Sequence, residues 1–343
     1  MGVRLKDIAM VAGVSESTVS LALNDKKVVN EKTREQIKEI ALSLGYSPNA
    51  IAKSLVRKRS GTIGLVVPDI ENPYFGRLVR CVDEVLMQRK YHLIVATSNE
   101  RLSGERRIVE NFISNRVEGV IIAPVNKACK EFDHMDKLRK NDISSVFVTA
   151  YHPGFPSSHV MVDLGKGTFD LVDYLIGLGH RSICFLVGDL EIIPTLTRVQ
   201  GYVKAYEKHD LAYDKSWFIH CSLPNFEQAY HATLSLLKSK KRFDAIITMN
   251  DIMALGVLRA LSEHRIRIPD QVSLAGYDNV IFSSIATIPI TTVEQDVRAM
   301  AVAAVDMLLG MTAETGNQHQ SVLLQPRLII RGSTGARTIH MEG

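Results

Sequence analysis

Polar and aromatic side chains that could bind a small molecule follow several apolar runs of the sequence. The segments PDIENPYF (68–75), TMND (248–251) and GYDN (276–279) come at the ends of such runs, and Arg198 lies near the start of a helical pattern. G-x-G-x-x-G after the first strand, G-x-x-x-x-G-K-[ST], H-E-x-x-H and G-x-S-x-G are absent. The sequence therefore favours binding over catalysis, and we expect neither an enzyme nor a cofactor.

An alternation of strand-like and helical patterns would position these loops. Apolar runs begin with TIGLVVPDI and recur as HLIVATS, GVIIAP, SVFVTA, ICFLVG, AIITMN and VSLAGYD, with amphipathic helical patterns between them. Such an alternation specifies doubly wound parallel sheets, and there are enough runs for two of them. Ligands of these sheets bind beyond the carboxyl ends of the strands, where the loops named above lie.

The first 46 residues indicate a second kind of chemistry, the recognition of DNA. An i, i+3, i+4, i+7 apolar stripe predicts a helix over 5–12, and Gly13 permits a tight turn with positive φ. Ser15 can cap a second helix over about 16–23, and a third helix follows over 31–44. Three short helices of this kind predict a helix-turn-helix domain whose second helix enters the major groove. On spacing alone, an ordinary helical hairpin is the alternative.

Charge and cysteine content limit the possible functions further. Residues 1–60 hold 11 Lys/Arg and 6 Asp/Glu, a balance of +5, whereas the remainder has a balance of −1. A basic head suits a protein that contacts DNA phosphates. The four cysteines include no C-x-x-C pair and no histidine at ligand spacing, so we expect reduced thiols and no metal site. Without a signal-like or membrane-spanning segment, we expect a cytoplasmic protein that does not bind membranes.

The segments LKDIAMVAGVSESTVSLALND and KTREQIKEIALSLGYSPNAIAKSL resemble the N-terminus of the lactose repressor and galactose repressor family of bacterial transcription regulators. The matches include the A-G-V-S turn, T-V-S, the L-N exit and the G-Y-x-P-N-x-x-A-x-x-L tail, and the resemblance extends to about residue 334. It implies a metabolite-responsive repressor that binds a pseudo-palindromic, double-stranded DNA operator as a homodimer. We expect a dimer because no leucine heptad follows the last strand. A solute-binding module without DNA function is the alternative.

The resemblance also implies which residues contact DNA. Glu16, Ser17 and Leu21 would read base edges, and Leu55 in a hinge helix would wedge into the minor groove. Leu21 departs from the basic or polar residue common in the family, and because it cannot donate to guanine we expect an altered operator half-site. An inert linker is the alternative for the hinge. The expected DNA-binding residues are Leu5, Ser15, Glu16, Ser17, Thr18, Ser20, Leu21, Asn24, Asn49, Ala52 and Leu55.

The body resembles the family's effector-binding core, which is similar to periplasmic sugar-binding proteins. In relatives, residues matching Tyr74 and Phe75 stack on purines, and residues matching Arg198, Asn250 and Asp278 bond sugar hydroxyls. Tyr74 and Phe75 could instead belong to a core helix, and Asp278 to a turn or cap. We expect a sugar-like effector, although Ile192, Ile193 and Pro194 favour a partly apolar one. The expected effector-binding residues are Asn72, Tyr74, Phe75, Thr149, Tyr151, Arg198, Asn250, Asp251 and Asp278.

The expected fold is α/β, with a three-helix helix-turn-helix head and two doubly wound parallel-sheet subdomains of periplasmic-binding-protein type. The head would cover 1–46, the hinge and linker 47–60, the effector-binding core 61–332 and the tail 333–343. Within the core, the first subdomain would comprise about 61–161 and 291–321, and the second about 162–290 and 322–332.

Overall fold

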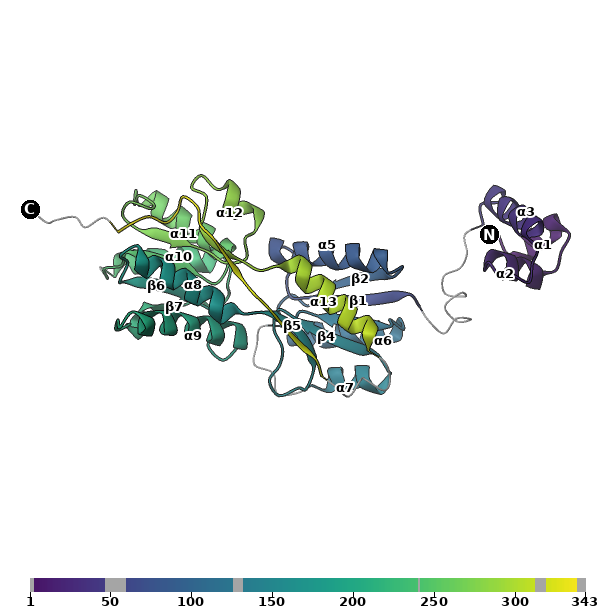
Figure 1. Ribbon diagram of the computed structural model, residues 1–343, viewed down its shortest axis with the longest axis horizontal. Helices are drawn as coiled ribbons and strands as arrows, with labels where there is room; N and C mark the ends of the chain where they lie inside the picture. The colour runs from purple at the N-terminus through teal and green to yellow at the C-terminus, as the bar shows by residue number, and fades with distance from the viewer. Residues whose placement is uncertain (1–2, 47–59, 126–131, 240, 312–318, 338–343) are drawn as a thin grey trace, which may run out of the picture. The chain divides into compact units, whose positions relative to one another are not determined.

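The computed structural model describes residues 3–46, 60–125, 132–239, 241–311 and 319–337 (Figure 1). The chain forms two compact units, Met1–Ser60 and Gly61–Gly343. The hinge predicted from the sequence lies almost entirely outside the described residues. The same holds for three of the expected DNA-binding residues, Asn49, Ala52 and Leu55.

The first unit contains the three predicted helices, α1 (Leu5–Ala12), α2 (Glu16–Leu23) and α3 (Glu31–Ser43). Gly13 ends α1 with φ +67°, in the left-handed region that glycine adopts without a Cβ clash. The Ser15 side chain caps α2 by accepting from the Thr18 N–H at 3.2 Å. Ile8, Val19 and Ile37 come from different helices and are buried together, so each helix buries one face in a common core.

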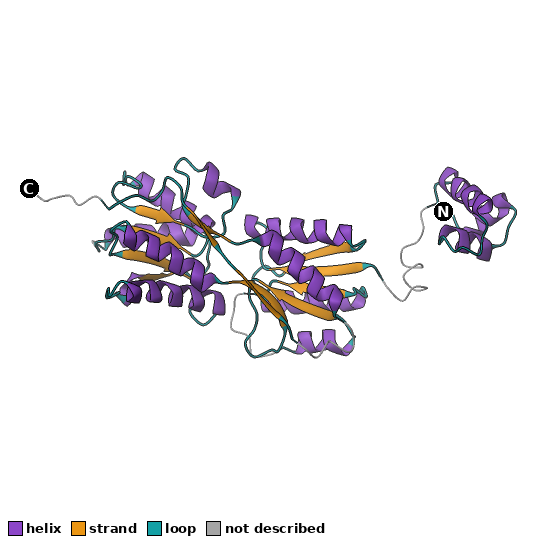
Figure 2. Cartoon of the chain, in the orientation of Figure 1, coloured by secondary structure: helices purple, strands orange, loops and turns teal. Residues whose placement is uncertain are grey.

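The second unit begins with a six-stranded parallel sheet of strand order β11-β5-β4-β3-β1-β2 (Figure 2). Its strands are β1 (Thr62–Val67), β2 (His92–Thr97), β3 (Gly119–Ile122), β4 (Ser144–Val148), β5 (Ser158–Val162) and β11 (Ser321–Leu324). Alternate strand residues point to opposite faces, which gives each face its own apolar core. Helices α5 (Pro73–Gln88) and α13 (Val297–Gly310) contribute to one core, α6 (Leu102–Ser114) and α7 (Asp133–Lys140) to the other.

A second parallel sheet, of four strands in the order β7-β6-β8-β9, follows along the chain. Its strands are β6 (Ile183–Val187), β7 (Phe218–His220), β8 (Ala245–Thr248) and β9 (Ser273–Ala275). Its helices are α8 (Leu164–Gly177), α9 (Ile193–Lys208), α10 (Phe226–Lys238), α11 (Asp251–Glu263) and α12 (Ile281–Ile285), with a short 3-10 helix at Lys215–Trp217. Helix α8 packs on α9, and α10 packs on α11.

The chain passes between the two sheets more than once, so neither subdomain is continuous in sequence (Figure 2). An antiparallel pair, β10 (Thr292–Glu294) and β12 (Arg327–Ile329), accompanies these crossings. Strand β11 pairs with β5 as far as Leu324 and Val162. Residues 322–324 and Val162 therefore belong to the first sheet, whereas the approximate boundaries expected from the sequence placed them in the second subdomain.

Within the described part of the chain, no helix is both long and apolar enough to cross a membrane. Across the same residues, no cluster of three or more His, Cys, Asp or Glu side chains could hold a metal ion. Cys81, Cys184 and Cys221 are free and buried, and burial raises the pKa of the Cys221 thiol to about 11.

Candidate ligand pocket and nucleic-acid interface

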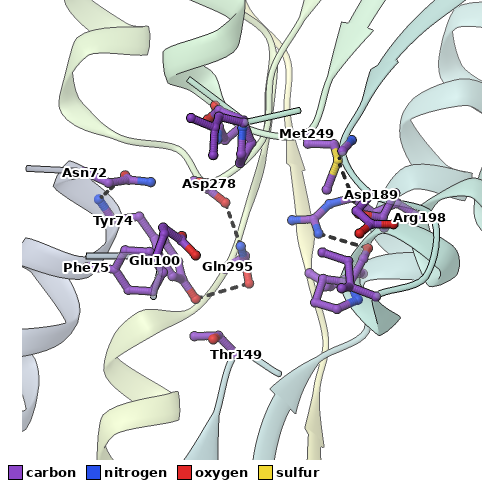
Figure 3. Close-up of a pocket in the computed structure, with 18 of the residues that line it drawn as sticks. Asn72, Tyr74, Phe75, Glu100, Thr149, Asp189, Arg198, Met249, Asp278 and Gln295 are labelled. Carbon is purple, nitrogen blue, oxygen red and sulfur yellow. Dashed lines mark hydrogen bonds between the residues drawn. The ribbon is translucent and has the colours of Figure 1, made fainter. Parts of the chain in front are cut away.

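A pocket lies between the two sheets of the second unit, at the carboxyl ends of their strands (Figure 3). It encloses about 950 Å³, including space open to solvent. Side chains and backbone of both subdomains line it: Asn72, Tyr74, Phe75, Glu100 and Thr149 from the first, and Leu164, Gly188, Asp189, Ile192, Pro194, Thr195, Arg198, Ser222, Leu223, Pro224, Met249, Asn250 and Asp278 from the second, with Gln295 from the crossing that follows β10. A molecule in the pocket would therefore contact both subdomains.

Three buried side chains form a hydrogen-bonded chain across the pocket. The Gln295 amide Nε2 donates to Asp278 Oδ1 at 2.6 Å, and the Tyr74 hydroxyl donates to Gln295 Oε1 at 3.3 Å (Figure 3). Burial raises the pKa of Asp278 to about 6, against the opposing effects of Arg198 and of the Gln295 hydrogen bond. An ionised carboxylate only accepts hydrogen bonds, so the chain fixes the direction of the Gln295 amide.

Arg198 lines this pocket, and one of its N–H groups has no hydrogen-bond partner within the described residues. Its guanidinium carbon lies 4.3 Å from the centroid of the Tyr277 ring, and its Nη1 donates to the Pro194 carbonyl at 3.1 Å. The Nε atom is buried and has no hydrogen-bond partner in the described structure. A buried N–H without an acceptor is unfavourable, so an oxygen of a bound molecule would restore a missing interaction.

Backbone strain accompanies the pocket. Thr149, Asp278 and Glu100 line it with φ values of +68°, +100° and +53°. For a β-branched residue such as Thr149, this left-handed region is unfavourable, and such strain persists where the surrounding structure enforces it. These conformations place residues of β-strand ends in the wall of the pocket, and strained residues of this kind cluster at binding sites.

Helix α2 of the first unit presents a polar surface on the side opposite its core. Val19 and Ala22 are buried, whereas Glu16, Ser17 and Leu21 are exposed, with 37% of Leu21 accessible. Ser15 uses its hydroxyl to cap the helix and also contacts the hydroxyls of Ser17 and Thr18 at 2.7 and 2.8 Å. An exposed, capped helix that follows a tight turn has the geometry of a major-groove reader.

Comparison with known proteins assigns both units. Residues 4–49 match the bacterial regulatory proteins of the lacI family, and residues 172–334 match a periplasmic binding protein-like domain. The HTH-type transcriptional repressor PurR of Haemophilus influenzae (strain ATCC 51907 / DSM 11121 / KW20 / Rd) is 30% identical over 334 residues, which cover 96% of this chain and 98% of that protein.

The chain belongs to the LacI family. It is a DNA-binding transcription regulator, as its relatives are. The structure of the Lac repressor dimer bound to operator and the anti-inducer ONPF aligns with a TM-score of 0.85 and 26% identity, covering 98% of this chain and 100% of that one. The complex of the transcriptional regulator CelR with cellobiose aligns with a TM-score of 0.70 and 26% identity, covering 96% and 99%.

The structure brings together most of the effector-binding residues predicted from this family's pattern. Seven of the nine line the pocket, namely Asn72, Tyr74, Phe75, Thr149, Arg198, Asn250 and Asp278. Tyr74 and Phe75 also lie in the first turn of α5 and are largely buried, as the core-helix interpretation expects. Their contact with a ligand stays a prediction.

Tyr151 and Asp251 were expected in the pocket but are not among the residues that line it. The Tyr151 ring stacks on His159, with 4.4 Å between the ring centroids, and packs against the core of the first subdomain. Asp251 is fully buried, where its carboxylate accepts from the Thr292 hydroxyl at 2.7 Å and from the Val280 N–H at 2.9 Å. Its side chain therefore holds the second subdomain together.

Asn250 lines the pocket, but its side chain already has structural partners. Its Oδ1 caps α11 by accepting from the Met253 N–H at 2.8 Å, and its Nδ2 donates to the Pro224 carbonyl at 2.8 Å. Asn72 similarly caps α5 through its Oδ1, which accepts from the Tyr74 N–H at 3.0 Å. In the head, the Asn24 amide donates to the Ser20 carbonyl and Leu5 packs against the core. These residues have structural roles beside any role in binding.

Sequence reasoning missed several pocket residues, of which Gln295, Glu100 and Met249 are the most informative. Gln295 directly follows strand β10, and its position after a strand is the only signal that could have identified it. Met249 lies inside the quoted TMND motif, and its sulfur accepts from the Gly188 N–H at 2.8 Å. Glu100 follows β2 in the same way as Thr149 follows β4, which is the pattern of strand ends meeting at one edge.

Proposed function

We propose that this LacI-family regulator is a homodimeric repressor that binds a pseudo-palindromic operator in the cytoplasm, and that a sugar-like effector in the pocket changes its operator affinity. The observation that carries the effector assignment is that the Arg198 guanidinium and the Asp278 carboxylate line the same pocket. A donor and an acceptor in one cavity match neighbouring hydroxyl groups of a ligand. We assign the pocket to binding without catalysis.

The apolar part of the pocket limits which hydroxylated molecules fit. Ile192, Pro194, Leu223 and Pro224 line it together with the Tyr74 and Phe75 pair. Apolar surface of this kind stabilises a ligand that has an apolar face or substituent beside its hydroxyls. The complex of CelR with cellobiose, whose fold and sequence are similar, supports the choice of a carbohydrate.

Exposed apolar side chains support the homodimer. Ile94 and Val95 are exposed on β2, the edge strand of the first sheet, and Ile281, Phe282 and Ile285 are exposed on α12. An edge strand with exposed apolar residues can pair with another chain, and exposed apolar patches are typical of protein interfaces. The relative bound to operator is a dimer, and two heads require two half-sites.

The head and the linker would supply the DNA contacts. We propose that α2 reads the major groove through Glu16, Ser17, Ser20 and Leu21, and that residues 47–60 form the hinge, with Asn49, Ala52 and Leu55 at the minor groove. The remaining expected contacts are Leu5, Ser15, Thr18 and Asn24, which flank these positions in the head.

Selection from random duplexes tests the DNA-binding part of this proposal. The full-length protein should enrich a two-fold symmetric sequence and bind it in a gel shift. Leu21→Arg should change the enriched half-site, whereas Val28→Arg adds the same charge at a residue outside α2 that is 84% exposed and should leave the half-site unchanged. Failure to enrich any sequence at low salt would support the alternative, a solute-binding module without DNA function.

Thermal shift with a panel of mono- and disaccharides and their alkyl glycosides tests the effector part. A carbohydrate present at about 100 times its Kd should add roughly 2.7 kcal/mol to the stability of the native protein. Arg198→Met should abolish the response, and Arg259→Met, at an exposed position on α11, should retain it. A response confined to nucleosides or small acids would remove the carbohydrate assignment.

A further inference from the structure

The loops that follow β1 and β6 form the same acidic turn, one in each subdomain. After β1 the turn holds Asp69 and Glu71. After β6 it holds Asp189 and Glu191. In both turns the aspartate Oδ1 accepts from the N–H of the glutamate at 2.9 Å. Asp189 lines the pocket, as does Asn72 directly after Glu71, so carboxylates from both subdomains accompany the pocket lining.

Inside the pocket, carboxyl groups also outnumber cations. Asp278, Glu100 and Asp189 line it together with one guanidinium, that of Arg198 (Figure 3). Among the described lining residues there is no lysine or histidine. The lining has a formal balance of −2 when all four groups are ionised, whereas the whole chain carries +4. The pocket is therefore an acidic site in a basic protein.

The charge of Asp278 is incompletely compensated. Its side chain is buried, Gln295 Nε2 donates to one of its oxygens at 2.6 Å, and within the described residues it forms no ion pair. The Arg198 guanidinium lies instead against the Tyr277 ring, 4.3 Å from its centroid. Burial raises the pKa of Asp278 to about 6, so most of the carboxyl group is ionised at neutral pH. A cation beside Asp278 would reduce the cost of burying this charge.

This arrangement favours a positively charged ligand over a neutral or negative one. A neutral hydroxyl can donate to Asp278 but leaves its charge in place. A phosphate or carboxylate would meet three like charges and one guanidinium in a partly enclosed site, where repulsion is screened less than in bulk water. A cleft lined by one sign of charge also concentrates ligands of the opposite sign.

We propose that the pocket selects its effector by charge: it binds an ammonium-bearing hydroxylated metabolite, of which an amino sugar is the simplest kind, and excludes sugar phosphates and sugar acids. The proposal rests on the proposed function, since it names the class of ligand for the same pocket. The ammonium group pairs with the carboxylates, and the hydroxyl groups take the remaining donors and acceptors of the pocket.

The charge of the pocket can be measured without an identified effector. Ser222 is exposed and lines the pocket, so Ser222→Cys places a thiol of similar size there. The readout is the ratio of its reaction rates with a cationic and an anionic methanethiosulfonate of similar size, after subtraction of the wild-type rates. Ser235→Cys, at an exposed position on α10 outside the pocket, is the control. The ratio for Ser222→Cys should exceed that of the control at least about tenfold, the lower range for charge focusing in a cleft.

Variants in the Ser222→Cys protein assign this ratio to the pocket carboxylates. Asp189→Asn and Asp278→Asn together should lower the ratio towards that of the control. Asp214→Asn removes an exposed carboxylate that pairs with Lys241 outside the pocket, and it should leave the ratio unchanged. Urea unfolding of each variant separates a change of charge from a loss of fold. A ratio for Ser222→Cys no higher than that of the control would overturn the proposal.

Matched ligands test the class of effector directly. Glucose, galactose and mannose are each compared with their 2-amino-2-deoxy and 6-phosphate derivatives by thermal shift and calorimetric titration. At least one amino sugar should bind about tenfold more tightly than its parent sugar, because hydrogen bonds between charged groups are roughly twice as strong as neutral ones. The phosphates should give no response. Asp278→Asn should remove the preference for the amine, and Asp214→Asn should retain it.

The outcomes separate this proposal from the proposed function. The charge selection would be overturned, with the carbohydrate assignment left in place, by a sugar phosphate that binds as tightly as its amino partner. A neutral sugar that binds while no amino sugar binds more tightly would have the same consequence. If no sugar of any kind responds, the proposed carbohydrate effector fails, and the cysteine reaction rates still decide whether the pocket selects by charge.

Discussion

Asp251 and Asp278 are two buried carboxyl groups of the second subdomain, and the charge of Asp278 disfavours ionisation of Asp251. Burial is the larger cause for both groups: it raises the pKa of Asp251 to about 7 and that of Asp278 to about 6. Only Asp278 lines the pocket. The subdomain therefore holds a pair of carboxyl groups that bind protons near neutral pH.

This pair predicts that stability falls as the pH rises from 5 to 8. An unfolded aspartate has a pKa of about 3.9, so between that pH and the folded pKa values the native state binds more protons than the unfolded state. The two groups favour the native state most below about pH 4, and this contribution is lost as the pH rises through 6 and 7. Urea unfolding across this range should show a slope of at most about 1.4 kcal/mol per pH unit for each group.

Neutral variants identify the groups responsible. Asp278→Asn should reduce the slope centred near pH 6, because the side chain no longer ionises. Asp189→Asn, at an exposed position on the rim of the pocket, should leave the slope unchanged. A slope that survives in the Asp251→Asn, Asp278→Asn double variant would assign the pH dependence to other groups.

The backbone strain at Thr149 should reverse the usual order of stability of its alanine and glycine variants. At most positions alanine is more stable than glycine, but at φ +68° alanine keeps the Cβ clash and glycine removes it. We expect Thr149→Gly to be more stable than Thr149→Ala by about 1 kcal/mol in urea unfolding. The usual order, with the alanine variant more stable, would show that Thr149 is not strained.

Ser15 links the stability of the head to DNA binding. Its hydroxyl accepts from the Thr18 N–H, and loss of such a cap costs about 1 kcal/mol. Ser15→Ala should increase amide hydrogen exchange within residues 3–46 of the full chain without changing exchange in the second unit. Ser43→Ala is the control, because the Ser43 hydroxyl donates to the Ile40 carbonyl at the end of α3 and caps no N-terminus. Equal exchange in the two variants would contradict the capping role.

The sequence predicts local features of this protein well. Gly13 and Ser15 act within a few residues of their positions, so a turn and a cap can be assigned from spacing alone. Strand-end rules similarly place Tyr74, Arg198 and Asp278 in one pocket, since parallel strands end at the same edge of a sheet. These rules predict where a residue lies in the fold.

The sequence does not show which partners a side chain forms its hydrogen bonds with. Asn250 and Asp251 are neighbours at the start of α11, yet one faces the pocket and the other is committed to Thr292 and Val280. Gln295 was missed because its partners, Tyr74 and Asp278, are brought to it only by the crossings between the two subdomains. Contacts made across such sequence separations follow from topology, which a local pattern does not contain.

Replacing Arg198 should have opposite effects on the stability of the protein and on its binding of a ligand. Its guanidinium is buried against Tyr277, makes no ion pair within the described residues and leaves Nε without a partner, so its charge is incompletely compensated. Burying a charged group whose hydrogen bonds are incomplete is unfavourable, and an apolar side chain of similar size avoids that cost. Arg198→Met should therefore unfold at the same or a higher urea concentration than the wild type, while losing the thermal response to carbohydrates. The ion pair of Arg259 with Glu263 is exposed, so Arg259→Met should change neither property appreciably. A strongly destabilised Arg198→Met would show instead that the arginine is a structural element whose contacts with Tyr277 and Pro194 outweigh the cost of burying it.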